Sequence, residues 1–227
     1  MKIAILVAMD KELSLVRAIL QDIEEFKTDN LYIIHGVIGN HDIYLSKCGI
    51  GKVNSAINTF RIIETIKPDL VINSGVAGGA GVPIGTLLIA DRVAYDDVWC
   101  GPSTEYGQAD GCPLFFTPGK NVIDLVTTLF SKDSYRFGLI CTGDKFISTS
   151  EEISFIRGHF PDVAAVDMES ASIAQTCYLT STPFNIIRVV SDTPGEGENL
   201  AQYENFWTEA PEKTFEALKT IISHIKK

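Results

Sequence analysis

The sequence predicts an α/β protein built as a three-layer α/β/α sandwich around a central mixed, twisted sheet. Apolar, β-rich runs alternate with helical patterns along the chain, and several of these runs are apolar on both faces. A strand of that kind belongs in a sheet that helices cover on each side. The runs at 31–38 and 42–48 predict a hairpin, which makes the sheet mixed. Since no linker or repeat is visible, we expect one domain over residues 1–227.

Eight apolar runs are expected to form the strands of this sheet. In chain order they cover residues 3–9, 31–38, 42–48, 69–73, 86–94, 135–141, 163–167 and 184–190. Six helices are expected from the spacing of apolar residues between and after the strands. Their starts are expected near Lys11, Lys52, Asn121, Thr149, Ser170 and Ala210. The clearest helical faces are formed by Val53, Ala56, Ile57, Phe60 and Ile63, and by Phe215, Leu218, Ile222 and Ile225.

The charge balance argues against several classes of partner. With a net charge of −10 and a pI near 4.8, the chain lacks the basic surface that nucleic acids and anionic membranes require. The seven apolar residues between Lys2 and Asp10 are too few for a signal-peptide core, and no other segment is long and apolar enough to span a bilayer. We therefore expect a cytoplasmic protein with a small-molecule ligand and no nucleic-acid or membrane partner.

The cysteines and histidines give no sign of a metal. The five cysteines are odd in number, widely spread and free of any Cys-x-x-Cys pair, which favours reduced, packed thiols over disulfides or zinc. The four histidines form no cluster with the spacing of metal ligands. We expect neither a metal nor a cofactor.

Three acidic residues stand where predicted strands end. Glu12 follows the run 3–9, Glu169 closes the run that begins at residue 163, and Asp192 follows the run 184–190. The carboxyl ends of strands line the ligand crevice of open α/β sheets. We therefore expect the three carboxyl groups to meet at one rim and to perform acid–base chemistry on a small polar molecule.

A glycine-rich segment, residues 75–85, follows one of the buried strands. It lacks the glycine spacing of a dinucleotide-binding turn and the Gly-Lys-Ser/Thr of a Walker loop. It is compatible with a tight loop between elements, and also with a loop whose backbone approaches a ligand because glycine has no side chain. So many glycines exceed what one turn requires, which favours the second interpretation.

Seven short motifs then occur in order along nearly the whole chain. They are AMDKE (8–12), GIGKV (49–53), NSGVAGG (73–79), EYGQ (105–108), TGDKFI (142–147), AVDME (165–169) and RVVSD (188–192). Together they resemble the bacterial 5′-methylthioadenosine/S-adenosylhomocysteine nucleosidases of the nucleoside phosphorylase superfamily. The resemblance implies a nucleoside phosphorylase-like fold and a homodimer. It also implies hydrolysis of the N-glycosidic bond to release adenine and a thio-sugar, a reaction of methionine salvage and the activated methyl cycle.

The resemblance assigns the catalytic roles to Asp192 and Glu12. Asp192 matches the acid that protonates the leaving adenine near N7, with the Ser191 hydroxyl orienting it; a dry pocket raises the pKa of such a carboxyl. Glu12 matches the group that activates the attacking water and stabilises the cationic sugar. From the residues alone, Asp192 is equally compatible with capping the loop 193–195. For Glu12, the residues alone favour a first-turn acid stabilised by the helix dipole, and the resemblance decides for the catalytic role.

The resemblance also implies a binding site for the sugar. Glu169 matches the residue that binds the ribose hydroxyls, since a carboxylate accepts two hydrogen bonds. Met168 is placed against the sugar face, and Met9 and Val76 beside the same ligand. Arg188 is expected to pair with an acid of the AVDME motif, because an unpaired arginine among apolar strand residues is costly.

At the two ends of the ligand, the resemblance implies mostly apolar contacts. Phe146 matches the aromatic residue that stacks on adenine, and Ile147 the residue whose backbone contacts the base edge. Ile50, Tyr106 and Tyr203 are placed at the alkylthio end, with Tyr106 contributed across the interface of the homodimer. On composition alone, a Phe-Ile pair is more often plain core.

The chain departs from the family pattern in three places. Val76 stands where many relatives have serine. Residues 95–100, which include Trp99, stand where many relatives have a Tyr-His-Asp-x-Asp stretch. Pro194 follows the expected acid closely and is expected to reshape that loop. None of these departures removes one of the three carboxyl groups.

Three alternatives compete with this interpretation. A phosphate-dependent purine nucleoside phosphorylase requires arginines around the phosphate, whereas the first strand is followed by Glu12, which repels an anion. A nucleosidase for AMP, futalosine or adenosine is a second alternative, although the apolar residues expected at the alkylthio end favour a thioether. A nucleoside-binding or storage protein is the third, and the presence of all three acids argues against it.

Overall fold

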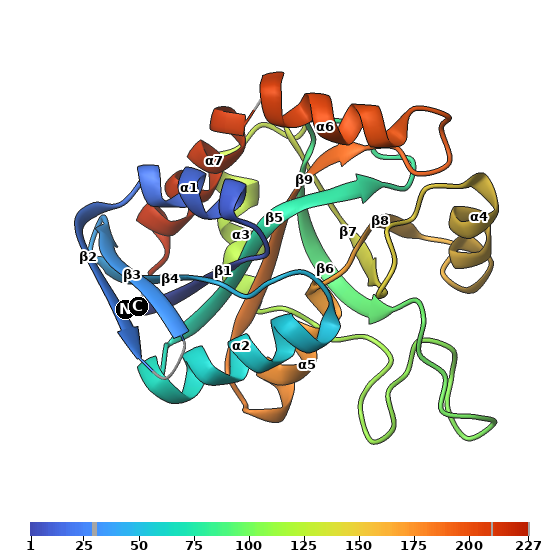
Figure 1. Ribbon diagram of the computed structural model, residues 1–227, viewed down its shortest axis with the longest axis horizontal. Coiled ribbons are helices and arrows are strands. Elements are labelled where there is room, and N and C mark those ends of the chain that lie inside the picture. Colours follow the sequence, from blue (N-terminus) through green and yellow to red (C-terminus); the bar gives the residue numbers. More distant parts are fainter. Residues whose placement is uncertain (29–30, 210, 227) are drawn as a thin grey trace.

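The computed structural model describes residues 1–28, 31–209 and 211–226, and it confirms the α/β class with a mixed sheet between helices (Figure 1). The strands are β1 (Lys2–Val7), β2 (Gln21–Thr28), β3 (Leu31–Ile38), β4 (His41–Lys47), β5 (Leu70–Gly79), β6 (Leu87–Tyr95), β7 (Tyr135–Thr142), β8 (Val163–Asp167) and β9 (Phe184–Asp192). The helices are α1 (Asp10–Ala18), α2 (Lys52–Ile66), α3 (Lys120–Leu129), α4 (Ser150–His159), α5 (Ser170–Leu179), α6 (Asn199–Glu209) and α7 (Pro211–His224).

The sheet closes on itself around β5. Its order is β2-β3-β4-β1-β5-β8-β7-β6-β9, and β9 pairs with β5 as well as with β6. The strands β5, β8, β7, β6 and β9 therefore form a ring, which the alternation of strands and helices did not predict. The ring closes because β5 is long: Leu70–Asn73 pair with β1, while Gly78 and Gly79 at its far end pair with β8.

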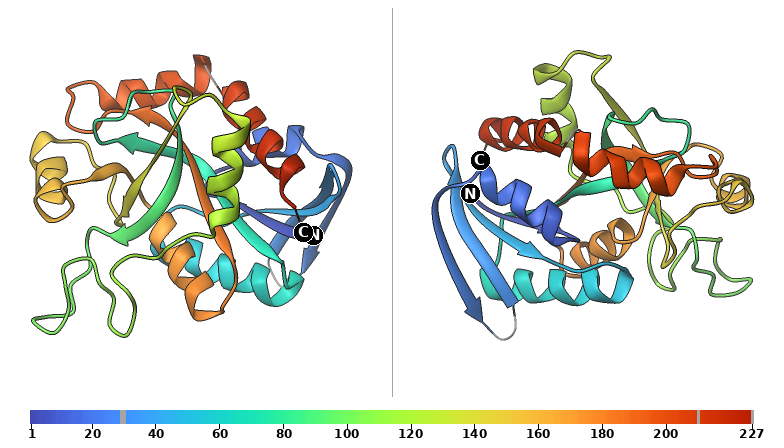
Figure 2. Two further views of the ribbon diagram at one scale, coloured as in Figure 1. Left: turned by 180° about the vertical axis from the view of Figure 1, so that it is seen from behind. Right: turned by 45° about the horizontal axis from the view of Figure 1, so that its top comes forward.

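Helices cover both faces of the sheet, as its apolar strands predicted (Figures 1 and 2). On one side α1, α3, α6 and α7 pack on a core that includes Val16, Val126, Phe206 and Leu218. On the other side α2 and α5 pack side by side over a second core. A smaller cluster around Ile153 joins α4 to the ends of β7 and β8.

Two elements differ from the expected ones for clear physical reasons. β2 is a charged edge strand whose residues are mostly exposed, so it lacks an apolar signature and is held by its pairing with β3. α6 was not expected, although Leu200, Tyr203 and Trp207 recur at helical spacing; Leu200 and Tyr203 face the cavity described below and do not belong to the buried core. The helix start expected near Ala210 falls outside the described residues, which resume with α7 at Pro211.

The glycine-rich segment is partly strand. β5 continues through Gly79, beyond the expected end at residue 73, and the turn that leads to β6 follows. A side chain on Gly78 would place its Cβ 2.6 Å from Pro194 Cγ, and one on Gly79 would place it 2.4 Å from the Val82 carbonyl oxygen. These glycines therefore allow β5 to pass close to its neighbours at the carboxyl end of the sheet.

Within the described ranges, no helix is both long enough and apolar enough to cross a membrane.

Candidate active site

A cavity of about 200 Å³ opens at the carboxyl ends of β1, β5, β8 and β9, and all three predicted carboxyl groups line it. Ten of the predicted site residues border this cavity. They are Met9, Glu12, Ile50, Val76, Phe146, Met168, Glu169, Ser191, Asp192 and Tyr203. Residues that lie far apart in the sequence thus meet around a single hollow, as the strand-end positions of the acids predicted.

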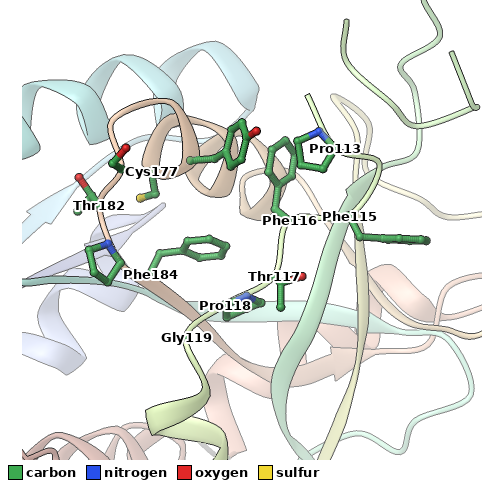
Figure 3. Close-up of a pocket in the computed structure, with 12 residues that line it drawn as sticks. Pro113, Phe115, Phe116, Thr117, Pro118, Gly119, Cys177, Thr182 and Phe184 are labelled. Carbon is green, nitrogen blue, oxygen red and sulfur yellow. The ribbon is translucent and has the colours of Figure 1, made fainter. Parts of the chain in front are cut away.

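A larger cavity of about 630 Å³ lies elsewhere, between the segment 113–119 and the region from Cys177 to Phe184 (Figure 3). Its walls are mainly proline and aromatic side chains, including Phe116 and Phe184, and no Asp, Glu, His, Lys or Arg side chain lines it. The smaller cavity is therefore the candidate active site, because it alone of the two combines apolar walls with several buried acids.

Glu12 bridges the start of α1 and the middle of β5. Its Oε2 accepts the N–H groups of Ala8 and Met9 at 2.8 and 3.1 Å, and its Oε1 accepts the Val76 N–H at 3.2 Å. Burial raises the pKa of Glu12, against the opposing effects of the Arg188 charge and of these three N–H groups. Glu12 is thus both a first-turn acid of its helix and a wall of the cavity, so the two interpretations of this residue are compatible.

A side chain at position 75 would collide with Glu12. The Cβ of any other residue at Gly75 would lie 2.5 Å from Glu12 Oε1, which is closer than side-chain carbons approach oxygen. At this one position the glycine-rich segment meets a requirement of the site: it lets a buried carboxylate lie directly against the backbone of β5.

Asp192 ends β9 and is only 2% exposed. The Ser191 hydroxyl donates to its Oδ1 at 2.6 Å, and Asn199 Nδ2 donates to its Oδ2 at 3.4 Å. Burial raises the pKa of Asp192, and these two hydrogen bonds oppose that effect. Burial thus favours the protonated form of this carboxyl group, the form that a general acid needs.

Glu169 follows β8 and precedes α5. Its Oε1 accepts the Gly51 N–H at 3.0 Å, which joins it to the start of α2. Burial and the nearby Asp167 charge raise the pKa of Glu169 to about 7, while the Arg188 charge lowers it. Its other oxygen, Oε2, accepts no hydrogen bond from the described residues.

Arg188 pairs with Asp167, as the sequence predicted, and it does not line the cavity. Its Nε lies 3.0 Å from Asp167 Oδ2, and its other donors bind Asn73 and Ser170. Arg188 therefore holds Asp167 in place and does not itself border the cavity. Its predicted direct contact with a ligand stays a prediction, and the geometry favours this supporting role.

Aromatic and thioether side chains form the apolar walls of the cavity. The rings of Phe146 and Tyr203 meet edge to face with 5.8 Å between their centroids, and the Tyr203 hydroxyl lies 3.2 Å from Met9 Sδ. Phe146 is 40% exposed in the described chain, which is unusual for a phenylalanine with only a packing role. This exposure favours a ligand-binding role over the plain core interpretation.

Besides Arg188, two predicted site residues lie outside this cavity. Ile147 lines a small neighbouring hollow of about 40 Å³ together with Phe146 and Asp192, and its carbonyl accepts Asn199 Nδ2 at 3.1 Å. Tyr106 stacks on His159 with 4.0 Å between ring centroids and does not border its own chain's cavity.

Sequence reasoning missed several residues of the site. Asn199 contacts Asp192, Leu200 lines the cavity while 57% exposed, and Asp167, Ala8, Ala77, Gly78 and Val166 contribute its remaining walls. Asn199 and Leu200 begin α6, and the helical spacing of Leu200, Tyr203 and Trp207 is the signal that could have found this helix. The small residues contribute by leaving room for the cavity, and the amino-acid composition does not reveal such a role.

Comparison with known proteins assigns the family. A family model described as the phosphorylase superfamily matches residues 2–223. A 5′-methylthioadenosine/S-adenosylhomocysteine nucleosidase of Haemophilus influenzae (strain PittEE) is 37% identical over 211 residues, which cover 91% of this chain and 92% of the relative. The chain belongs to the 5′-methylthioadenosine/S-adenosylhomocysteine nucleosidase family. A second relative, the nucleosidase of Exiguobacterium sp. (strain ATCC BAA-1283 / AT1b), is 39% identical over 208 residues, 88% of this chain and 89% of the relative.

Solved structures of nucleosidases share the fold across the whole chain. The S-adenosylhomocysteine nucleosidase of Streptococcus pyogenes, in complex with 5-methylthiotubericidin, matches with a TM-score of 0.94 and 33% identity over 100% of this chain and 98% of that one. The 5′-methylthioadenosine/S-adenosylhomocysteine nucleosidase of S. pneumoniae, with a transition-state inhibitor, matches with a TM-score of 0.94 and 32% identity over 100% of both chains. The nucleoside phosphorylase-like fold expected from the sequence is thereby confirmed.

Proposed function

We propose that this chain hydrolyses the N-glycosidic bond of 5′-methylthioadenosine and S-adenosylhomocysteine, releasing adenine and methylthioribose or S-ribosylhomocysteine. The observation that carries the proposal is the meeting of Glu12, Glu169 and Asp192 in one cavity walled by Phe146 and Met168. Family membership supports the same reaction, since the matched relatives are nucleosidases named for these two substrates.

Asp192 is the general acid of the proposed mechanism. Adenine leaves without a full negative charge if a proton reaches its N7, and Asp192 carries a proton more readily because burial raises its pKa. Asn199 Nδ2 donates to both Asp192 Oδ2 and the Ile147 carbonyl, so it fixes the position of the acid relative to the residue expected to contact the base edge. The Ser191 hydrogen bond fixes the carboxyl group on the opposite side.

Glu12 is the group that activates water. Three backbone N–H groups hold its carboxylate in one orientation at the wall of the cavity. As adenine departs, the sugar gains positive charge, which a nearby carboxylate stabilises while it accepts a proton from the attacking water. The N–H of Val76 takes part in this arrangement through the backbone, so the valine found where many relatives have serine leaves that contact unchanged.

Glu169 binds the ribose hydroxyls, and Met168 packs against the sugar. The Gly51 N–H occupies Glu169 Oε1, which leaves Oε2 to accept hydrogen bonds from a ligand. Phe146 stacks on adenine, while Ile50, Leu200 and Tyr203 give the other end of the cavity the apolar character that a thioether requires. A phosphate in that place would meet no cation of the described residues, because none of their Lys or Arg side chains lines the cavity.

The absence of cationic lining also favours water over phosphate as the nucleophile. Arg188 is the arginine of β9, and its Nε and Nη2 donors are already bound to Asp167, Asn73 and Ser170. A phosphate beside Glu12 and Glu169 would meet two acids in a partly dry cavity, which is unfavourable. Phosphorolysis therefore lacks both a binding group and a compatible charge.

A homodimer is part of the proposal. Val53, Ile57 and Phe60 lie along one side of α2 and are all strongly exposed. α5 packs beside α2, and its Tyr178 and Leu179 are also exposed (Figure 1). Apolar side chains gathered in this way are typical of an interface. Tyr106, which does not reach its own chain's cavity, is proposed to complete the alkylthio end of the partner subunit's cavity.

A substrate screen tests the proposed function. Methylthioadenosine, adenosylhomocysteine, adenosine, inosine and AMP are incubated with the protein, with and without phosphate, and the free base is quantified by chromatography. We expect adenine from the two thio-nucleosides at rates that phosphate does not change. Formation of ribose 1-phosphate products only when phosphate is present would instead identify a phosphorylase. Preference for AMP would show that the substrate is AMP and not a thio-nucleoside.

A further inference from the structure

The start of α2 is capped by carboxylates from other parts of the chain. Gly51 occupies the N-cap with a φ of 90°, and the first turn contains no acidic residue. The Gly51 N–H donates to Glu169 Oε1 at 3.0 Å, and the Lys52 N–H donates to Asp144 Oδ1 at 2.7 Å. The free N–H groups and the positive dipole end of α2 therefore bind two separate carboxylates, one of which lines the cavity.

Asp97 closes this arrangement into a ring of three residues. Its carboxylate accepts Lys52 Nζ at 2.7 and 2.8 Å and the Asp144 N–H at 2.9 Å. Since the Lys52 N–H already binds Asp144, each of the three residues contacts the other two. Lys52, Asp97 and Asp144, here called the α2 clamp, join the segment after β6, the segment after β7 and the first residue of α2.

The clamp lies at the surface and is partly shielded from solvent. The side chains of Lys52 and Asp97 are 22% and 34% exposed, and Lys52 Nζ lies 5.4 Å from the centre of the Tyr95 ring. A Cβ at Gly51 would lie 3.0 Å from Asp144 Oδ1, and one at Gly143 would lie 3.2 Å from Asp97 Cγ. Partial burial and close glycine contacts hold the ion pair more firmly than water-exposed pairs are held.

We propose that Asp97 is a positioning residue of the nucleosidase reaction, which acts through the α2 clamp to hold the Gly51 N–H on Glu169 and the Phe146 ring at the cavity. The inference rests on the proposed function, because that function assigns the sugar contact to Glu169 and the base contact to Phe146. Gly51 directly precedes Lys52, and Phe146 follows Asp144 by two residues. The clamp therefore fixes two walls of the cavity without touching a ligand.

Replacement of Asp97 by alanine tests the positioning role in turnover. Asp97→Ala is expected to lower kcat/KM for methylthioadenosine by about 10- to 100-fold, since a displacement near 1 Å has effects of that size. Asp97→Asn keeps one acceptor and is expected to lose less. The matched control is Asp162→Ala, which removes the ion pair to Arg92 at the opposite end of β8 and is expected to change kcat/KM by less than about twofold.

A double variant shows whether Asp97 acts through Glu169. In a Glu169→Gln background the sugar contact is already impaired, so adding Asp97→Ala is expected to lower kcat/KM much less than it does in the wild type. Equal losses in the two backgrounds, or equal losses for Asp97→Ala and Asp162→Ala, would overturn the proposal.

Amide hydrogen exchange gives a readout that does not depend on turnover. Asp97→Ala is expected to speed exchange at the N–H groups of Gly51, Lys52 and Asp144, and to leave the Phe160 N–H, bound to the Ile156 carbonyl at 2.8 Å, unchanged. Unchanged protection at all three amides would overturn the proposal even if activity fell. If these amides lose protection but the wild type releases no adenine from methylthioadenosine, the proposed function fails and the clamp itself stands.

Discussion

Arg188 and Asp167 form an ion pair inside the protein, with 2.9 Å between Arg188 Nη2 and Asp167 Oδ2 and only 2% of either side chain exposed. The Thr142 hydroxyl donates to the other Asp167 oxygen at 2.6 Å. Both charges of the pair are therefore already bound by groups of the protein. Asp167 and Glu169 both line the cavity, but Asp167 ends β8 and is bound to Arg188, whereas Glu169 follows the strand and accepts only the Gly51 N–H among the described residues.

Breaking this pair is expected to destabilise the fold strongly. Arg188→Met leaves the Asp167 carboxylate buried without its partner, and the free energy of unfolding should fall by about 3–5 kcal/mol. Arg92→Met is the matched control, because its partner Asp162 is 58% exposed and the expected loss is about 1 kcal/mol or less. Urea denaturation followed by circular dichroism measures both; similar losses would show that burial does not strengthen the Arg188 pair.

Asp192→Asn is expected to stop turnover while preserving binding. Asparagine keeps the size of the side chain and an acceptor for the Ser191 hydroxyl, but it has no carboxyl proton to give to adenine. We expect kcat to fall by about 10²- to 10⁴-fold and the affinity for adenine, measured by calorimetry, to stay within about tenfold. Ser191→Ala, which retains the acid and loses only its 2.6 Å hydrogen bond, should lose less. Retention of full turnover by Asp192→Asn would remove the acid assignment.

Much of the fold was readable because buried strands and amphipathic helices leave periodic patterns. The strand from Val163 to Asp167 was predicted with its observed bounds, and the start of α2 at Lys52 also agreed. The acids could be placed at one rim because strand ends meet there in this class of sheet. Their roles required the seven motifs, since the residues around Glu12 alone favour a first-turn acid.

The remaining features depend on contacts between distant segments. β2 is charged and exposed, so only its pairing with β3 makes it a strand, and no local pattern records that. The closure of the sheet needs β9 to pair with β5 and β6 together. Asn199 joins the site through hydrogen bonds to Asp192 and to the Ile147 carbonyl, and no local pattern records such contacts between separate segments.

Glu169 is expected to make folding stability depend on pH. Burial and the Asp167 charge raise its pKa from 4.5 to about 7 in the folded protein. A carboxyl with a raised pKa binds its proton more tightly when folded, so its stabilising contribution is complete below pH 4.5 and is lost as the pH rises to about 7. This shift of the Glu169 pKa corresponds to about 3 kcal/mol in the free energy of unfolding.

A matched variant isolates this effect. Urea unfolding is measured at pH 4.5 and at pH 7.5 for the wild type and for Glu169→Gln, whose side chain does not titrate. The free energy of unfolding should fall more between the two pH values in the wild type. Glu12 and Asp192, whose pKa values burial also raises, titrate in both proteins, so the difference between them reports on Glu169. Identical pH dependence in the two proteins would contradict the assigned shift.

Activity is expected to change with pH in the opposite direction from stability over the same interval. The ribose hydroxyls need acceptors, and the ionised form of Glu169 offers more of them than the protonated form. In the wild type kcat/KM should therefore rise as the pH approaches about 7, and the need for a protonated Asp192 should lower it once the pH passes the raised pKa of that residue. Initial rates across pH 5–9 measure the profile. Glu169→Gln should alter the acidic limb, and the limb that remains reports on Glu12, which must also be ionised and whose pKa burial also raises.

Subunit mixing tests whether Tyr106 serves the partner's cavity. Glu12→Gln removes the water-activating group, and Tyr106→Ala removes the side chain proposed to cross the interface. If Tyr106 acts across the dimer, a mixed dimer contains one complete site, because the subunit with intact Glu12 receives Tyr106 from the other. The two variants, unfolded together and refolded, should then show more activity than the sum of the variants refolded separately.

If Tyr106 instead completes its own subunit's cavity, each site in the mixed dimer carries one defect and no gain appears. A second mixture, with Glu12→Gln and Asp192→Asn, serves as a control: both residues line the same chain's cavity, so each site keeps one defect and activity should not rise.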